Sequence, residues 1–76
     1  MGDVSEKITS SKFPKYANEN RKRVEIKQMK CNHCGSKNTI CIYSDTAASN
    51  IGVYIYEEYF CTDCQFFTTF EYEYDS

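Results

Sequence analysis

The chain has 76 residues, of which nine are Lys or Arg and eleven are Asp or Glu, so its formal net charge is −2 at pH 7. A chain of this length has room for one domain and buries too little surface to be stable on hydrophobic contacts alone, so we expect a metal or a cross-link to stabilise it. No apolar run approaches the roughly 20 residues that cross a bilayer, which excludes a transmembrane role and a membrane partner.

The net charge conceals a difference between the two halves of the chain. All nine Lys and Arg residues lie in residues 1–37 beside four acids, whereas residues 38–76 hold seven acids and no base. An acidic second half repels the phosphate backbone, so we expect any contact with nucleic acid to come from the first half.

Residues 1–23 are polar, contain the only proline and show no sustained apolar period, so we expect a flexible basic N-terminal arm. The folded domain is then expected to cover residues 24–76. The candidate nucleic-acid-binding residues are the cationic side chains of the arm and one just beyond it: Lys12, Lys15, Arg21, Lys22, Arg23 and Lys27.

From Val24 onward β-branched and aromatic residues predominate, which is typical of strands. Two-residue alternation predicts a first strand that leads from Val24 to the first cysteine. Further strands are expected at residues 38–43, 53–60 and 66–74, with a polar loop at residues 44–52. The fold class predicted is a small metal-stabilised all-β domain of three to four antiparallel strands.

Two cysteine pairs, Cys31 with Cys34 and Cys61 with Cys64, each enclose two residues and are separated by 26 residues. Such a short turn aims both sulfurs at one metal, and a hairpin between the pairs can bring them together. We therefore expect one structural Zn²⁺ held by these four residues, the cysteine quartet. Zinc supplies roughly 10–16 kcal/mol of folding free energy in small finger peptides. We expect the metal to decide whether this domain folds.

The two turns, a first knuckle at residues 31–35 and a second at residues 61–65, differ in their last residue. Gly35 can adopt a positive φ, which lets backbone N–H groups point at sulfur. Gln65 stands where a glycine is usual, so we expect the second turn to be strained or differently shaped.

Other residues that could bind a metal or act in catalysis have simpler interpretations. His33 could replace a cysteine as a ligand, but inside the turn its ring is expected to face solvent or donate to sulfur. Cys41 is flanked by isoleucines and is expected to be a small buried residue. Glu57 and Glu58 point to opposite faces of a strand, so we expect solvated edge charges and not an acid–base pair. No catalytic residue is assigned, and we do not expect an enzyme.

Two alternatives to the zinc site follow from the cysteines. A disulfide scaffold is disfavoured by the odd count of five cysteines and by the lack of an apolar signal segment, so we expect a reducing, cytoplasmic location, or the nucleus in a eukaryote. A rubredoxin-like iron site shares the spacing, but the second knuckle lacks a glycine and the chain has no tryptophan. The colour of the purified protein distinguishes iron from zinc.

Nine of the twelve aromatic residues fall between Tyr54 and Tyr74. One interpretation is a compact aromatic core. The other is a surface that stacks bases or binds a protein partner, because a three- or four-stranded ribbon cannot cover so many rings. The candidate partner-binding residues share one face of the last predicted strand: Phe66, Phe70, Tyr72 and Tyr74.

Two knuckles with an aromatic strand after the second resemble the zinc ribbons of the transcription machinery, above all the C-terminal ribbon of transcript-cleavage elongation factors and small RNA-polymerase subunits. The resemblance covers residues 24–74 and implies a zinc ribbon fold. Elongation factors carry an Asp-Glu pair at the tip of the loop between the knuckles. Here that loop has Asp45 and no glutamate, so cleavage stimulation is not expected.

We weigh two functions. In the first, a non-enzymatic accessory protein of nucleic-acid machinery, most simply transcription, docks its acidic ribbon on a protein such as RNA polymerase while the basic arm contacts phosphate. In the second, a protein-interaction module or inhibitor uses the acidic aromatic half to occupy a nucleic-acid-binding groove on its partner. The sequence leaves open DNA or RNA, the oligomeric state, and a cellular or viral origin.

Overall fold

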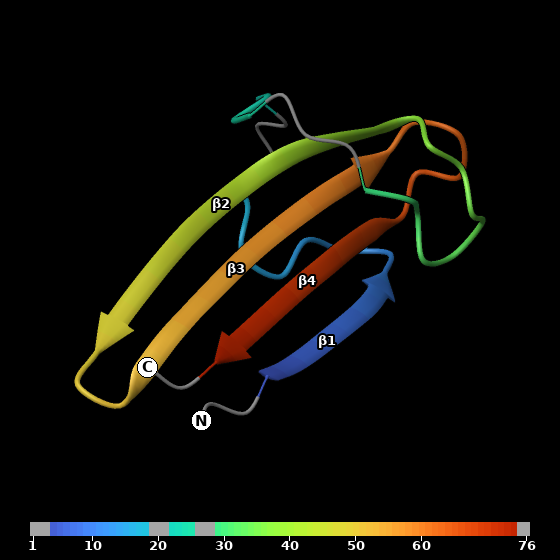
Figure 1. The fold of residues 1–76 in the computed structure, drawn as a ribbon. Coiled ribbons are helices and arrows are strands. Elements are labelled where there is room, and N and C mark those ends of the chain that lie inside the picture. The colour runs from blue at the N-terminus through green and yellow to red at the C-terminus, as the bar shows by residue number, and fades with distance from the viewer. Residues whose placement is uncertain (1–3, 19–21, 26–28, 75–76) are drawn as a thin grey trace.

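The computed structural model describes residues 4–18, 22–25 and 29–74 (Figure 1). Four strands form one antiparallel sheet in the order β1-β4-β3-β2. Their bounds are β1 Val4–Ser11, β2 Thr39–Ser49, β3 Gly52–Cys61 and β4 Phe67–Tyr74. The described ranges contain no helix, which confirms the predicted small all-β class with four antiparallel strands, consistent with a zinc ribbon. Accordingly, this part of the chain has no helix that could span a membrane.

Strand β1 lies within the segment for which the sequence predicts a flexible arm, and that prediction is wrong for residues 4–11. They pair with β4 along its whole length, from Val4 opposite Tyr74 to Ser11 opposite Phe67. Pairing satisfies backbone groups that β4 would otherwise leave at an open sheet edge. The side chains of residues 6–9 are exposed, so little hydrophobic patterning marks this strand in the sequence.

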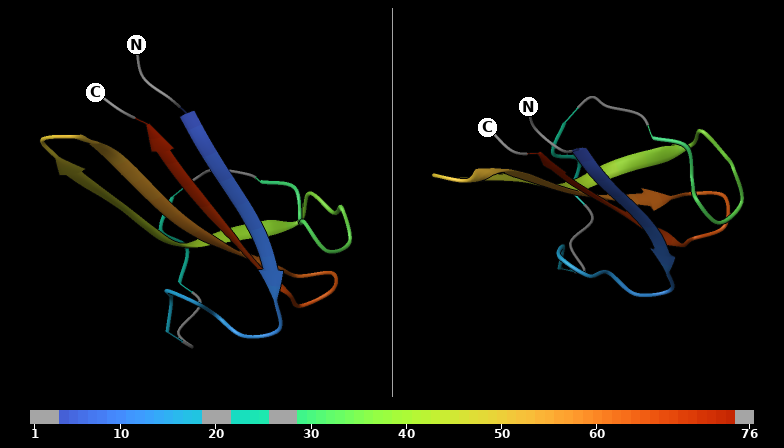
Figure 2. Two further views of the ribbon diagram at one scale, coloured as in Figure 1. Left: turned by 90° about the horizontal axis from the view of Figure 1, so that it is seen from below. Right: turned by 60° about the horizontal axis from the view of Figure 1, so that its bottom comes forward.

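The chain that follows β1, residues 12–18, crosses one face of the sheet (Figures 1 and 2), and we call it the crossing segment. Its backbone is hydrogen-bonded to a β3 side chain, and the ring of Tyr16 stacks on Tyr43 of β2 at 5.5 Å between centroids. The predicted flexible arm is therefore wrong here as well. The boundary expected between residues 23 and 24 does not separate an arm from a folded domain.

The described start of the predicted first strand of the folded domain forms an isolated bridge with β2. Glu25 pairs with Cys41 on the outer edge of β2, and the Val24 N–H donates to the Cys41 carbonyl oxygen at 2.8 Å. Residues 26–28 of that predicted strand lie outside the described residues. The fourth strand of the described sheet comes from the N-terminal end of the chain, as β1.

The expected loop at residues 44–52 is wrong for most of its length. Strand β2 continues to Ser49 and pairs with β3 from Ser44 opposite Glu57 to Ser49 opposite Gly52. Residues 45–49 are exposed and small or polar, so their sequence resembles that of a loop although their backbone is paired. The connection itself is a short turn at residues 50–51.

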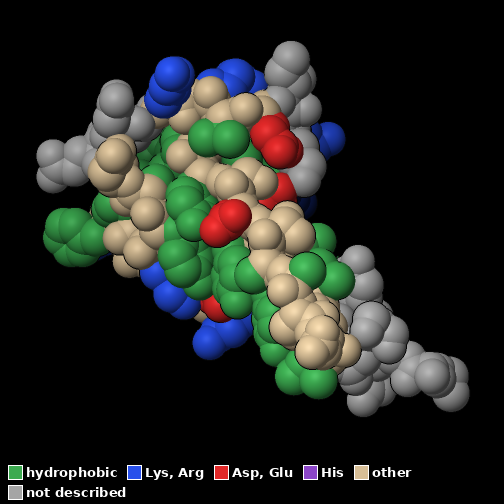
Figure 3. Space-filling view, turned by 90° about the vertical axis from the view of Figure 1, so that its left-hand side faces the viewer, with side chains coloured by type: hydrophobic (Ala, Val, Ile, Leu, Met, Phe, Trp, Pro, Cys, Tyr) green, Lys and Arg blue, Asp and Glu red, His purple; other side chains and the backbone are tan. Residues whose placement is uncertain are grey.

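A small hydrophobic core lies at the knuckle end of the sheet and consists of Ile42, Phe60 and Phe67, with Ala17 and Ile40 packed against it. A register shift between Cys41 and Tyr43 places the extra residue, Ile42, in this core. Seen from the side shown in Figure 3, hydrophobic side chains gather near the middle of the molecule with acidic side chains between them. A core this small leaves the fold dependent on other contacts.

Candidate metal centre

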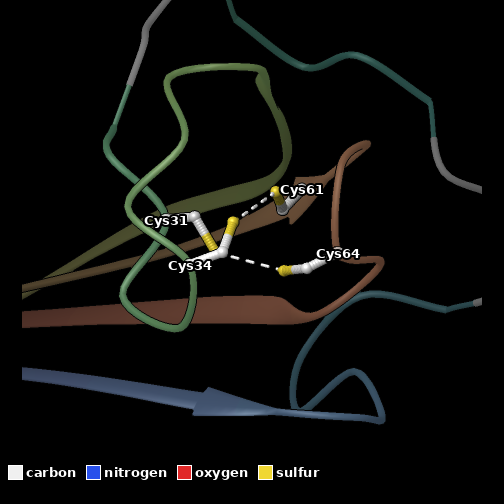
Figure 4. Close-up of side chains that lie close together, drawn as sticks. All are labelled: Cys31, Cys34, Cys61 and Cys64. Atoms are coloured by element: carbon white, nitrogen blue, oxygen red, sulfur yellow. Dashed lines mark hydrogen bonds between the residues drawn. The ribbon is translucent and has the colours of Figure 1, made fainter.

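The cysteine quartet comes together at the knuckle end of the sheet, where β3 ends at Cys61 (Figure 4). The four sulfur atoms all lie within 4.8 Å of one another, with Cys31 Sγ to Cys64 Sγ at 3.5 Å and Cys34 Sγ to Cys61 Sγ at 3.6 Å. Tetrahedral coordination at about 2.3 Å from zinc to sulfur spaces the sulfurs by about 3.8 Å. The quartet therefore has the size and the ligand set to hold one metal ion.

The two knuckles have the same backbone turn. In each, the N–H of the residue after the second cysteine donates to the carbonyl oxygen of the first, from Gly35 to Cys31 and from Gln65 to Cys61, both at 2.9 Å. The φ angles are also alike, +80° at Gly35 and +63° at Gln65. The expectation of strain at Gln65 is thus confirmed, whereas the alternative of a differently shaped turn is wrong. The left-handed conformation costs a residue with a Cβ about 1–2 kcal/mol.

The sulfurs differ in how readily they ionise. Burial raises the pKa of Cys31, but hydrogen bonds from the backbone of Cys34 and His33 and from the Cys64 thiol outweigh it and lower the value to about 6. Burial, opposed by a backbone hydrogen bond and reinforced by the neighbouring sulfurs, raises the pKa of Cys64 to about 12. Cys31 therefore ionises more readily than Cys64, whose ionisation depends on the charge of a bound cation.

Hydrogen bonds from each knuckle to neighbouring segments support the quartet. The Asp63 carboxylate of the second knuckle accepts hydrogen bonds from the Ser36 hydroxyl and from the Asn38 side-chain amide, the last at 3.0 Å. These donors lower the pKa of Asp63. On the other side, the Asn32 N–H donates to the Thr68 hydroxyl of β4 at 3.2 Å. Both knuckles are thus connected to each other and to the sheet.

His33 and Phe66 form a stacked pair across the two knuckles, with ring centroids 3.7 Å apart and planes 5° from parallel. Among the described residues, the group that could hold a metal contains four cysteines and no histidine, which disfavours His33 as a ligand. Phe66 precedes β4 and faces His33, so it does not share the strand face expected for the partner-binding residues.

Of the other partner-binding candidates, Phe70 and Tyr72 are half-buried on β4, with ring centroids 6.0 Å apart. Tyr74 pairs through its backbone with Val4 and Val53, but its side chain lies outside the described part of the structure. Of the four rings expected on this face, the structure therefore describes two on β4, those of Phe70 and Tyr72.

Cys41 is fully buried in β2, as the sequence predicts, and burial raises the pKa of its thiol. A protonated, inaccessible thiol is a poor nucleophile. The fifth cysteine is therefore separate from the quartet in both position and chemistry.

Glu57 and Glu58 are buried, at 3% and 0% exposure, so their prediction as solvated edge charges is wrong. The Glu58 carboxylate accepts hydrogen bonds from three backbone N–H groups of the crossing segment. The donor-to-acceptor distances are 2.6 Å from Lys15, 3.0 Å from Tyr16 and 2.8 Å from Ala17. The Thr69 hydroxyl donates to it at 3.1 Å. These hydrogen bonds compensate a buried charge and attach the crossing segment to β3.

The predicted phosphate-contacting residues are not equivalent. Lys12, Lys22 and Arg23 are exposed, whereas the Lys15 ammonium pairs with the Glu71 carboxylate of β4 at 2.9 Å. Arg21 and Lys27 lie outside the described residues. All four described cations of this set are therefore exposed to solvent, and Lys15 is in addition paired with the sheet.

No protein-family model, curated protein or solved structure matches this chain.

Proposed function

We propose that this chain is a non-enzymatic zinc ribbon in which one Zn²⁺ has a structural role. The observation that carries the proposal is the convergence of four cysteine sulfurs within 4.8 Å from two knuckles of the same shape. Four thiolates fill the tetrahedral positions that zinc takes in structural sites, so no position remains for a water or a substrate. The metal's contribution is to folding.

We further propose that the protein is an accessory factor of nucleic-acid machinery, most simply of transcription. Its support is the resemblance of residues 24–74 to the zinc ribbons of that machinery and the separation of charge along the chain. In this proposal the acidic sheet docks on a protein such as RNA polymerase. The exposed cations Lys12, Lys22 and Arg23 contact phosphate.

The test is the salt dependence of binding to a short duplex and to a single strand, measured by fluorescence anisotropy on zinc-loaded protein. Each phosphate contact adds about 0.7 to 0.9 to the slope of log affinity against log salt. Replacing Lys12, Lys22 and Arg23 together by Gln should lower the slope by about 2–3. Lys30→Gln combined with Lys37→Gln is the control, since both lysines are exposed and outside the proposed set. An unchanged slope in the triple variant would remove the phosphate contacts from the proposal.

A second candidate function is a protein-interaction module whose acidic half occupies a nucleic-acid-binding groove. The observation that favours it is the attachment of β1 and the crossing segment to the sheet, which limits the reach of the N-terminal cations. Affinity purification from the native cell, with nuclease added to half the sample, identifies the partner. Nucleic acid that competes with the chain on that partner supports the second function, and nucleic acid that joins the complex supports the first.

A further inference from the structure

A hollow of about 190 Å³ lies on the sheet, next to the crossing segment. Its walls come from three strands and consist of Lys7, Tyr54, Tyr56, Glu71, Tyr72 and Glu73. It is separate from the cysteine quartet and from the exposed cations Lys12, Lys22 and Arg23.

Strand register explains why Lys7, the tyrosines of β3 and the glutamates of β4 meet. Tyr56 of β3 lies opposite Glu71 of β4, which lies opposite Lys7 of β1, and Tyr54 lies opposite Glu73 one step farther along. Residues two apart in a strand point to the same face, so the two tyrosines lie beside the two glutamates.

The crossing segment bounds one end of the hollow. Tyr16 meets the ring of Tyr56 edge-on at 5.7 Å between centroids, and Lys15 pairs with Glu71. The charge of Glu71 is therefore already compensated within the chain. The Tyr54 side of the hollow lies farther from this segment along β3.

The far side of the hollow combines an aromatic surface with Glu73, a carboxylate outside the described ion pair, while Lys7, the cation in the lining, lies opposite Glu71. The rings of Tyr54 and Tyr56 are 6.3 Å apart between centroids and 8° from parallel, so the two rings stand next to each other along β3 in the same orientation. Glu73 is exposed, and within the described residues the one ion pair is that between Lys15 and Glu71. A planar cation can lie on a tyrosine face while it donates to this carboxylate.

We propose that this hollow, the tyrosine hollow, binds an arginine side chain from a basic segment of a protein partner. A guanidinium is planar, so it stacks flat on an aromatic ring and presents a fork of donors to a carboxylate. An ammonium contacts a ring only as a point charge, as Lys15 does over Tyr16, and has no fixed fork. Charge complementarity supports a basic partner, because the lining holds Glu71 and Glu73 against one cation, Lys7, and residues 38–76 hold seven acids and no base. The same charge disfavours a nucleotide on this surface, since its phosphate would be repelled. The inference rests on the docking part of the proposed function and names its chemistry.

The first test titrates zinc-loaded, isotope-labelled protein with capped Gly-Gly-Arg-Gly-Gly and follows the ring signals of Tyr54 and Tyr56 by NMR. The matched peptides replace Arg by Lys or by citrulline, which keeps the planar shape and loses the charge. We expect saturable shifts that are strongest at Tyr54, with Arg at least about threefold tighter than Lys and citrulline weakest. Equal shifts with all three peptides, or none with Arg, would overturn the proposal.

Variants locate the site. Glu73→Gln and Tyr54→Leu should each weaken the arginine peptide about threefold or more, while Tyr54→Phe, which keeps the ring, should stay within about twofold. Glu6→Gln is the control, because it removes the same charge from the opposite face of β1. Retained affinity in Glu73→Gln, or tighter binding of guanosine monophosphate than of the arginine peptide at this surface, would refute the inference. The measurement of how nucleic-acid binding depends on salt tests other residues with another ligand. A failed peptide titration therefore does not change the conclusion drawn from that measurement.

Discussion

Replacing Glu58 by Gln tests whether the buried carboxylate holds the crossing segment on the sheet. One carboxylate oxygen accepts the N–H groups of Tyr16 and Ala17, and the other accepts the Lys15 N–H and the Thr69 hydroxyl. A glutamine oxygen can retain the first two hydrogen bonds. Its amide nitrogen, however, then faces the Lys15 N–H, so two donors meet.

The magnitude follows from these contacts. Hydrogen bonds to a charged group contribute about 1.5–3 kcal/mol and neutral ones about 0.5–1.5, so the two retained bonds weaken by about 1 kcal/mol each. An unsatisfied buried N–H costs about 1–3 kcal/mol more. We therefore expect Glu58→Gln to lower the free energy of unfolding by about 3–5 kcal/mol, a large fraction of the about 5–15 kcal/mol of a typical domain.

The assay is urea unfolding of zinc-loaded protein, followed by tyrosine fluorescence and far-ultraviolet circular dichroism. With a slope of about 1 kcal/mol per molar urea for so small a domain, the midpoint should fall by about 3 M or more. Glu73→Gln, at an exposed carboxylate, is the control and should change stability by less than about 0.5 kcal/mol. Amide exchange at residues 15–17 should accelerate in Glu58→Gln. A midpoint equal to that of the control, with those amides still protected, would refute this account of Glu58.

Three further predictions concern the second knuckle, the Lys15 pair and His33. Gln65→Gly should stabilise the zinc-loaded protein by about 0.5–1 kcal/mol in urea unfolding, because relief of the left-handed strain exceeds the entropy that glycine adds to the unfolded chain; a loss of stability would contradict the strain. The hydrogen bond from Lys15 lowers the pKa of Glu71, so this pair stabilises the fold above the unfolded value near 4.5 and ceases to do so as the pH falls through the folded value. An acid titration of the Glu71 carboxyl by carbon NMR checks the sign, and a midpoint above 4.5 would reverse it. His33→Phe should leave the metal content of the protein unchanged, since the ring stacks on Phe66; loss of metal by mass measurement would make His33 a ligand.

The cysteine quartet could be predicted from the sequence because its geometry is local. Two residues between cysteines set each turn, and one hairpin joins the turns. The left-handed residue at Gln65 follows from the same local rule, since its φ of +63° matches the turn that Gly35 makes at +80°. These parts of the site depend little on the rest of the chain.

The N-terminal part of the fold could not be predicted in this way. β1 is held by the free edge of β4, more than 50 residues away in sequence, and its exposed side chains carry little apolar pattern. The burial of Glu58 depends on backbone N–H groups 41 to 43 residues away. Every residue type except proline carries the same backbone N–H, so residue identity does not show which backbone donors a carboxylate will meet. The sequence therefore predicts an arm and a solvated charge where the structure has a polar strand and a buried carboxylate.

We propose above that the quartet binds one metal ion, and we expect the fold to depend on it. The most direct measurement is native mass spectrometry of the purified chain, with circular dichroism before and after a chelator, on wild type, Cys61→Ser and Cys41→Ser. We predict one zinc per chain, loss of strand signal with chelator or in Cys61→Ser, and retained metal in Cys41→Ser, because Cys41 lies outside the quartet. A bound iron would replace zinc in the proposal. A metal-free chain whose strand signal the chelator leaves unchanged would contradict the account.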